Sequence, residues 1–283
     1  MEDNKIEGVA NVESKETLQA ALKEIEMWEK DQKSLWFWER IGRLPFKLLD
    51  KITPAFVQNK IGLLLDELGN FIQTGGQYLT QERLILKKFE ELEGKTELNL
   101  SHIADLPLAK MDQVSEELKK SRAKAATIQG ATTGFGGIFT LAIDIPMILG
   151  LSLKTLQEIA IAYGYDPNQK EERVFIVKCL QFVSADIVGK KAILDELSNH
   201  YGSESRTQMV SQLQGWREVV VTYTDQFGWK KLFQLIPIAG MFIGAFMNKS
   251  MMQDVAEAGI MLYRKRRILE RLEQSDEQKS LTL

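Results

Sequence analysis

Apolar residues recur at helical spacing along much of the chain. Over 17–28 the apolar positions follow one another in steps of three and one, which places them on one face of a helix. The same spacing predicts helices over 108–126, 171–188, 210–227 and 250–271, and Gly164–Pro167 predicts a helix end. The sequence therefore predicts an all-α fold, a multi-helix globular bundle.

Two stretches depart from this pattern because they lack charge. Residues 125–153 contain one formal charge, at Asp144, and residues 232–248 contain none. An Asp just before a Pro at a helix start is a common capping arrangement. Asp144 and Pro146 therefore predict a tight bend between two helices, at about 125–142 and 146–163. Pro237 predicts the start of a further helix in the second stretch.

Both uncharged stretches contain glycines one helical turn apart, and we predict that these are helix-packing residues: Gly130, Gly134, Gly240 and Gly244. Such pairs let another helix backbone approach closely, in lipid and in a water-soluble core alike. The two glycine-rich apolar hairpin segments are interpreted as buried core helices, as a membrane-inserted hairpin, or as a switch between the two. The preferred interpretation is a buried core.

Asp144 and Asn248 are the candidate buried polar residues in these stretches. An ionisable group in apolar surroundings can bind an ion or titrate at an unusual pH. The preferred interpretation of Asp144 is simpler: its side chain caps the helix that begins near Pro146.

Two basic stretches contrast with the rest of the chain, whose formal net charge is −3. One lies within 33–60 and interleaves cations with aromatic residues, and the other lies within 264–271. Trp favours the membrane interface, and Lys and Arg attract anionic lipid. The residues expected to contact membrane or lipid are Trp36, Phe37, Trp38, Arg40, Arg43, Lys47, Arg264, Lys265, Arg266 and Arg267. The alternative is that the aromatic residues belong to a core and the cations to a solvated rim.

The remaining chemistry of the sequence is sparse. A net negative charge argues against a nucleic-acid partner, and the single cysteine, Cys179, fits a reducing compartment. The acidic start of the chain does not resemble a secretory signal. No His, Cys or carboxylate cluster has metal-ligand spacing, and no nucleophile elbow or phosphate loop occurs. We therefore expect no catalytic residue, no metal and no cofactor.

Three segments carry a family resemblance. They are ATIQGATTG at 126–134 leading to DIP at 144–146, IAIAYGYD at 159–166, and IPIAGMFIGAFMN at 236–248. Their order and spacing resemble the EcsC family of bacterial proteins over about residues 25–271. That family is named after a gene beside an ABC transporter operon in Gram-positive bacteria. The resemblance implies a bacterial, cytoplasmic-side context, and it supplies no catalytic residue. The Trp-rich segment at 34–40 is not part of the pattern.

These features predict one α-helical domain at 14–272 between a disordered N-terminus, 1–13, and a disordered tail, 273–283. We expect a non-enzymatic, membrane-associated protein that lies peripherally at the cytoplasmic face of the bacterial membrane. Its partner would be lipid or a membrane protein such as a transporter, and its oligomeric state stays open. The alternatives are a soluble helical scaffold that binds a protein partner and a hydrolase that uses Asp144 in a buried pocket.

Overall fold

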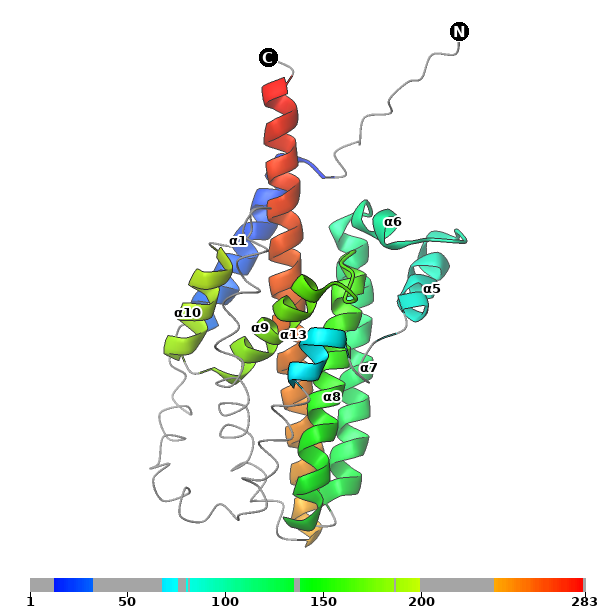
Figure 1. The fold of residues 1–283 in the computed structure, drawn as a ribbon, viewed down its shortest axis with the longest axis vertical. Helices are drawn as coiled ribbons and strands as arrows, with labels where there is room; N and C mark the ends of the chain where they lie inside the picture. Colours follow the sequence, from blue (N-terminus) through cyan, green and yellow to red (C-terminus); the bar gives the residue numbers. More distant parts are fainter. Residues whose placement is uncertain are drawn as a thin grey trace.

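The protein is built from helices (Figure 1). The computed structural model describes residues 13–32, 68–75, 80, 82–134, 138–185, 187–198 and 237–281, and within these ranges all regular structure is helical. The elements are α1 (Lys15–Gln32), a helical segment at 68–74, α5 (Glu82–Glu93), α6 (Leu100–Ala104), α7 (Leu108–Gly134), α8 (Ile138–Ala162), α9 (Lys170–Ser184), α10 (Ile187–Ser198) and α13 (Pro237–Leu281). The predicted all-α fold is confirmed. The predicted helix at 210–227 and the Trp-rich segment lie outside the described residues.

Three long helices form the axis of the molecule. α7 and α8 are an antiparallel hairpin, and α13 runs beside both of them in the direction of α8 (Figure 1). The most extensive pairing among the described helices is that of α7 with α13. This arrangement places the last turns of α7, the first turns of α8 and the first turns of α13 at one end of the bundle.

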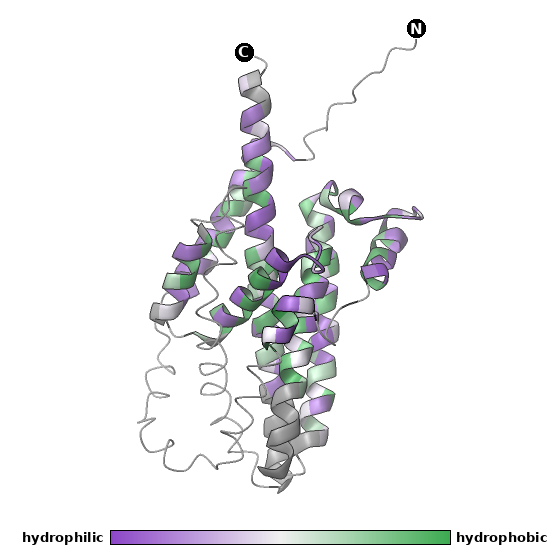
Figure 2. Ribbon diagram, in the orientation of Figure 1, coloured by the Kyte–Doolittle hydropathy of each residue, from purple (hydrophilic) through white to green (hydrophobic). Residues whose placement is uncertain are grey.

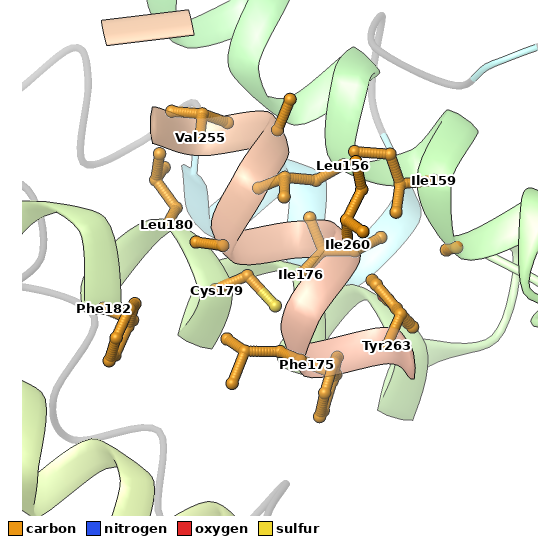
Figure 3. Packing of buried hydrophobic residues seen from close by; sticks show 14 of the residues in the cluster. Leu156, Ile159, Phe175, Ile176, Cys179, Leu180, Phe182, Val255, Ile260 and Tyr263 are labelled. Atoms are coloured by element: carbon orange, nitrogen blue, oxygen red, sulfur yellow. The ribbon is translucent and has the colours of Figure 1, made fainter. Parts of the chain in front are cut away.

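The main core lies where α9 crosses α8 and α13. Figure 3 shows Leu156 of α8, Phe175 and Cys179 of α9, and Ile260 and Tyr263 of α13 gathered in one buried cluster. Burying an aliphatic or aromatic side chain of this size contributes about 1.5–3 kcal/mol before conformational entropy is subtracted. This cluster joins α8, α9 and α13 through their buried faces.

α7 ends at Gly134 and α8 begins at Ile138, so the predicted bend at Asp144 and Pro146 is wrong. α7 continues to Gly134, and Pro146 lies inside α8, where it removes the backbone hydrogen bond to the carbonyl of residue 142. Three of the residues at 134–137 are glycine, each about 1 kcal/mol less favourable in a helix than Ala, whereas one Pro costs about 3 kcal/mol. Local helix propensity therefore does not by itself favour a helix end near the glycines over one near Pro146.

The C-terminal helix is longer at both ends than the predicted 250–271. α13 begins at Pro237, as the sequence predicts for the start of a helix there, and continues to Leu281 through the residues predicted to be a polar tail. Glu13, placed by the sequence in the disordered N-terminus, is ion-paired with Arg271 of α13. Likewise, the predicted helix at 171–188 is two helices, since α9 ends at Ser184 and α10 begins at Ile187.

A close approach of α8 and α13 depends on Gly259, which the sequence analysis did not single out. A Cβ atom at Gly259 would lie 2.7 Å from Leu156 Cδ2 and 3.2 Å from Ile159 Cδ1, whereas one at Gly69 would meet nothing within 4 Å. We expect Gly259→Ala to destabilise the protein by about 1–2 kcal/mol, because overpacking outweighs the gain in helix propensity. Gly69→Ala, the control, should be neutral or stabilising in urea unfolding. Equal effects at the two positions would contradict this account.

Candidate functional site

The two uncharged stretches, far apart in the sequence, come together at one end of the bundle. The last ten residues of α7, the first sixteen of α8 and the first twelve of α13 lie there, and among them only Asp144 carries a formal charge. We call these residues, 125–134, 138–153 and 237–248, the uncharged end. The other half of the bundle is different, since hydrophilic residues recur along the upper part of α13 (Figure 2).

The register of α7 against α13 is fixed by two ion pairs. When two antiparallel helices lie side by side, the numbers of two residues that face each other add to a nearly constant value, which we call the register sum. For α7 with α13 the register sum is 376 for the ion pair of Asp112 with Arg264, and again 376 for that of Lys119 with Glu257. The sum is 374 both for Gly130 with Gly244 and for Gly134 with Gly240. The structure therefore brings the four predicted packing glycines to two shared levels of the α7–α13 pair, inside the uncharged end.

The two candidate polar residues occupy different positions. Asp144 lies within α8, well past its first residue Ile138, so the prediction that it caps a helix is wrong. Asn248, the last residue of the uncharged part of α13, is buried.

Large apolar side chains are exposed on the uncharged end. Ile128 of α7 and Met147 of α8 are 58% and 49% exposed. The α7–α8 register sum is 275 for Asp112 with Tyr163, which are hydrogen-bonded, and 280 for Arg122 with Glu158, which are ion-paired. The sum is 275 for Ile128 with Met147, so the two exposed side chains lie at the same level of neighbouring helices.

The predicted basic patch at 264–267 lies largely inside the protein. Lys265, Arg266 and Arg267 are all buried, so the expectation that they form a membrane-facing surface is wrong. Arg266 forms an ion pair with Glu172 of α9 at 2.9 Å, and its guanidinium lies 4.0 Å from the centre of the Tyr165 ring. Lys265 is ion-paired with Glu29 of α1 at 2.7 Å.

The two outer members of this cluster have their own partners. Arg267 donates to the backbone carbonyl of Tyr163 at 2.6 and 3.1 Å, which ties α13 to the end of α8. Arg264 is only partly buried and is ion-paired with Asp112 of α7 and Glu24 of α1, each at 3.0 Å. The four cations therefore join α13 to α1, α7, α8 and α9.

Three buried tyrosines complete this ion network. The hydroxyls of Tyr163, Tyr165 and Tyr263 donate to Asp112, Glu270 and Glu172 at 2.6, 3.0 and 2.6 Å. Burial raises the pKa of all three phenols, and the carboxylates of Asp112 and Glu172 raise the pKa of Tyr163 and Tyr263 further. Burial opposes the charge of Arg266, but Glu172, Tyr165 and Glu270 outweigh it and raise its pKa. The phenols therefore stay protonated and act as hydrogen-bond donors to these carboxylates.

Two further arginines behave in the same way: Arg271, which ends the predicted basic stretch, and Arg173, which sequence reasoning missed. Arg271 donates to the carbonyls of Ala104 and Leu106 at 2.8 and 2.6 Å. Arg173 of α9 donates to the carbonyls of residues 72, 73 and 168, at 2.8, 2.9 and 2.5 Å. A guanidinium that collects carbonyls from separate segments gives no local sequence signal, because its partners lie far away in the chain.

The described residues offer little for catalysis or metal binding. Among them, no group of three or more His, Cys, Asp or Glu side chains is arranged to hold a metal ion. Cys179 is buried, and burial raises the pKa of its thiol well above the ordinary value. The first basic stretch, with Trp36, Phe37, Trp38, Arg40, Arg43 and Lys47, lies outside the described residues.

Within the described part of the chain, none of the helices combines the length and the hydropathy that a membrane span requires.

Comparisons with known proteins place the chain among relatives of undescribed activity. A family model described as the EcsC protein family matches residues 19–268. The chain is similar to the uncharacterized protein YdbA of Bacillus subtilis (strain 168), with 59% identity over 93% of this chain and 97% of that protein. It is also similar to protein EcsC of the same organism, with 28% identity over 54% of this chain and 61% of that protein. No solved structure gives a significant match.

Proposed function

The chain belongs to the EcsC family, and we propose that it is a non-enzymatic protein of the membrane surface that enters one leaflet of the bilayer with its uncharged end. The observation that carries this proposal is the meeting, at one end of the bundle, of three helix segments whose one formal charge is Asp144, with Ile128 and Met147 exposed at one level. Single exposed apolar residues are normal in soluble proteins, but their position on helix segments with almost no charge is typical of an interaction site.

The length of the uncharged end supports entry into one leaflet. At 1.5 Å per residue, its segments of α7, α13 and α8 are about 15, 18 and 24 Å long. The hydrocarbon core of a bilayer is about 30 Å thick, so one leaflet accounts for about 15 Å. Helices also suit this environment because their backbone hydrogen bonds are satisfied within each segment. The proposed site of action is the cytoplasmic face of the bacterial membrane, where the partner is lipid or a membrane protein.

Vesicle binding tests the proposal. We expect the wild-type chain to float with phospholipid vesicles and the double variant Ile128→Asp with Met147→Asp to lose at least tenfold in binding. The reason is that each change removes an apolar side chain worth about 1.5–3 kcal/mol on burial and adds a charge. The measurement is a vesicle flotation titration, with the fold of each variant verified by circular dichroism.

The structure offers a matched control for this experiment. Met27 of α1 and Leu84 of α5 are 61% and 52% exposed and belong to helices away from the uncharged end. Met27→Asp with Leu84→Asp should bind vesicles as the wild type does. A wild-type chain that does not float, or an equal loss in both double variants, would contradict the proposed function and favour a soluble scaffold.

A further inference from the structure

Each of the three long helices has a lysine at the border of its uncharged segment. Lys124 directly precedes the uncharged part of α7, Lys154 directly follows that of α8, and Lys249 directly follows that of α13. The first acidic residue beyond each lysine, away from the uncharged end, is at least one helical turn further on: Glu117 on α7, Glu158 on α8 and Asp254 on α13. The border is therefore locally positive on an acidic protein.

The three lysines also share one level of the bundle. The α7–α8 register sum is 278 for Lys124 with Lys154, between the values of 275 and 280 set by the observed contacts. The α7–α13 sum is 373 for Lys124 with Lys249, within one helical turn of the observed 376. Three helices thus each place a lysine residue at about the same level, where the charged half of the bundle meets the uncharged end.

These lysines have no acidic partner among the described residues, unlike two other cations nearby. Lys119 is ion-paired with Glu257, and Arg122 is ion-paired with the buried Glu158. Within the described part of the chain, by contrast, Lys124, Lys154 and Lys249 make no ion pair. Lys124 and Lys249 are exposed and Lys154 is half-buried, so all three ammonium groups can meet an external anion.

We infer that Lys124, Lys154 and Lys249 form a collar that binds the phosphate groups of anionic phospholipids while the uncharged end fills the leaflet below. This inference rests on the proposed function and adds the lipid class and the depth of insertion. Below that level the segments of α7, α13 and α8 extend about 15, 18 and 24 Å, so they reach at least through the roughly 15 Å of hydrocarbon in one leaflet. Lysines at that depth lay their aliphatic stems along apolar surface and keep the ammonium group among the headgroups.

The test compares two kinds of vesicle, phosphatidylcholine alone and phosphatidylcholine mixed with phosphatidylglycerol. The variant is Lys124→Gln with Lys154→Gln and Lys249→Gln. Because each lysine near an anionic surface strengthens binding several-fold, the triple variant should bind the anionic vesicles roughly a hundredfold more weakly. Its binding to the neutral vesicles should match the wild type, and high salt should reduce the difference on anionic vesicles.

A control of equal charge change separates the collar from bulk charge. Lys23, Lys87 and Lys95 are exposed on α1, on α5 and just after α5, and their triple change to Gln should leave most of the anionic preference intact. An equal loss in both triple variants would overturn the collar. If the wild type and the collar variant bind both kinds of vesicle equally well, the collar is contradicted and the proposed function stands. If the wild type binds neither kind of vesicle, the proposed function itself is contradicted.

Discussion

Glu172→Leu is expected to lower the free energy of unfolding by about 3–5 kcal/mol, because it leaves the buried Arg266 guanidinium without its main counter-ion. Both residues are buried, and Glu172 also accepts the hydrogen bond of Tyr263. Arg266 keeps a weaker ion pair with Glu270 at 3.4 Å and its contact with the Tyr165 ring. Because these contacts remain in the variant, we expect the loss of stability to stay within that range and the variant to fold. Urea unfolding followed by circular dichroism measures it.

The decisive comparison is with the double variant Glu172→Leu with Arg266→Met. Replacing both members of a buried ion pair with apolar side chains of similar volume is often neutral or stabilising. The double variant should therefore be more stable than Glu172→Leu alone. A double variant whose loss equals the sum of the two single losses would show that the two residues act independently, and this would contradict the network described here.

An exposed ion pair provides the scale for this experiment. The side chains of Lys88 on α5 and Glu117 on α7 are 3.5 Å apart and are 38% and 50% exposed. Glu117→Leu should change the free energy of unfolding by less than about 1 kcal/mol, since surface ion pairs contribute little. The contrast with Glu172 tests whether burial, and not charge pairing alone, explains how much the network contributes to the free energy of unfolding.

The basic cluster shows how far the sequence could predict this protein. Counting charge along 264–271 indicated a cationic surface, yet the acidic partners of Lys265 and Arg266 come from α1 and α9, 236 and 94 residues away. A local charge count contains no information about such partners. The periodicity of α1, α7 and α13, by contrast, needs only neighbouring residues, and it predicted that these helices exist.

The ends of the helices and the candidate site illustrate the same limit. The sequence located both uncharged stretches and their glycines, because composition is a local property. It did not predict that the stretches meet, since that follows from the path of α13 beside α7 and α8. The lysines Lys124, Lys154 and Lys249 are unremarkable in the sequence because only the register of the three helices brings them to one level.

Gly164→Ala is expected to destabilise the protein by about 2–5 kcal/mol. Gly164 follows the end of α8 with φ +78°, where an L-residue costs about 1–2 kcal/mol. A Cβ atom there would also lie 2.8 Å from Ala104 Cα and 2.9 Å from Ala104 N, so backbone must move. Any shift spreads into the ion network, because Arg271 bonds the carbonyl of Ala104 and Arg267 that of Tyr163. Urea unfolding again supplies the measurement.

Gly94→Ala isolates the steric part of this effect. Gly94 also has a positive φ, +63°, but a Cβ atom there would meet nothing within 4 Å. We expect Gly94→Ala to cost only the backbone strain of about 1–2 kcal/mol, so the difference between the two variants reports the contact with Ala104. If Gly164→Ala were no more destabilising than Gly94→Ala, the close approach of the two turns would not support the fold. The conformation of the segment 163–166 would then need an explanation other than the junction that it forms between α6, α8 and α13.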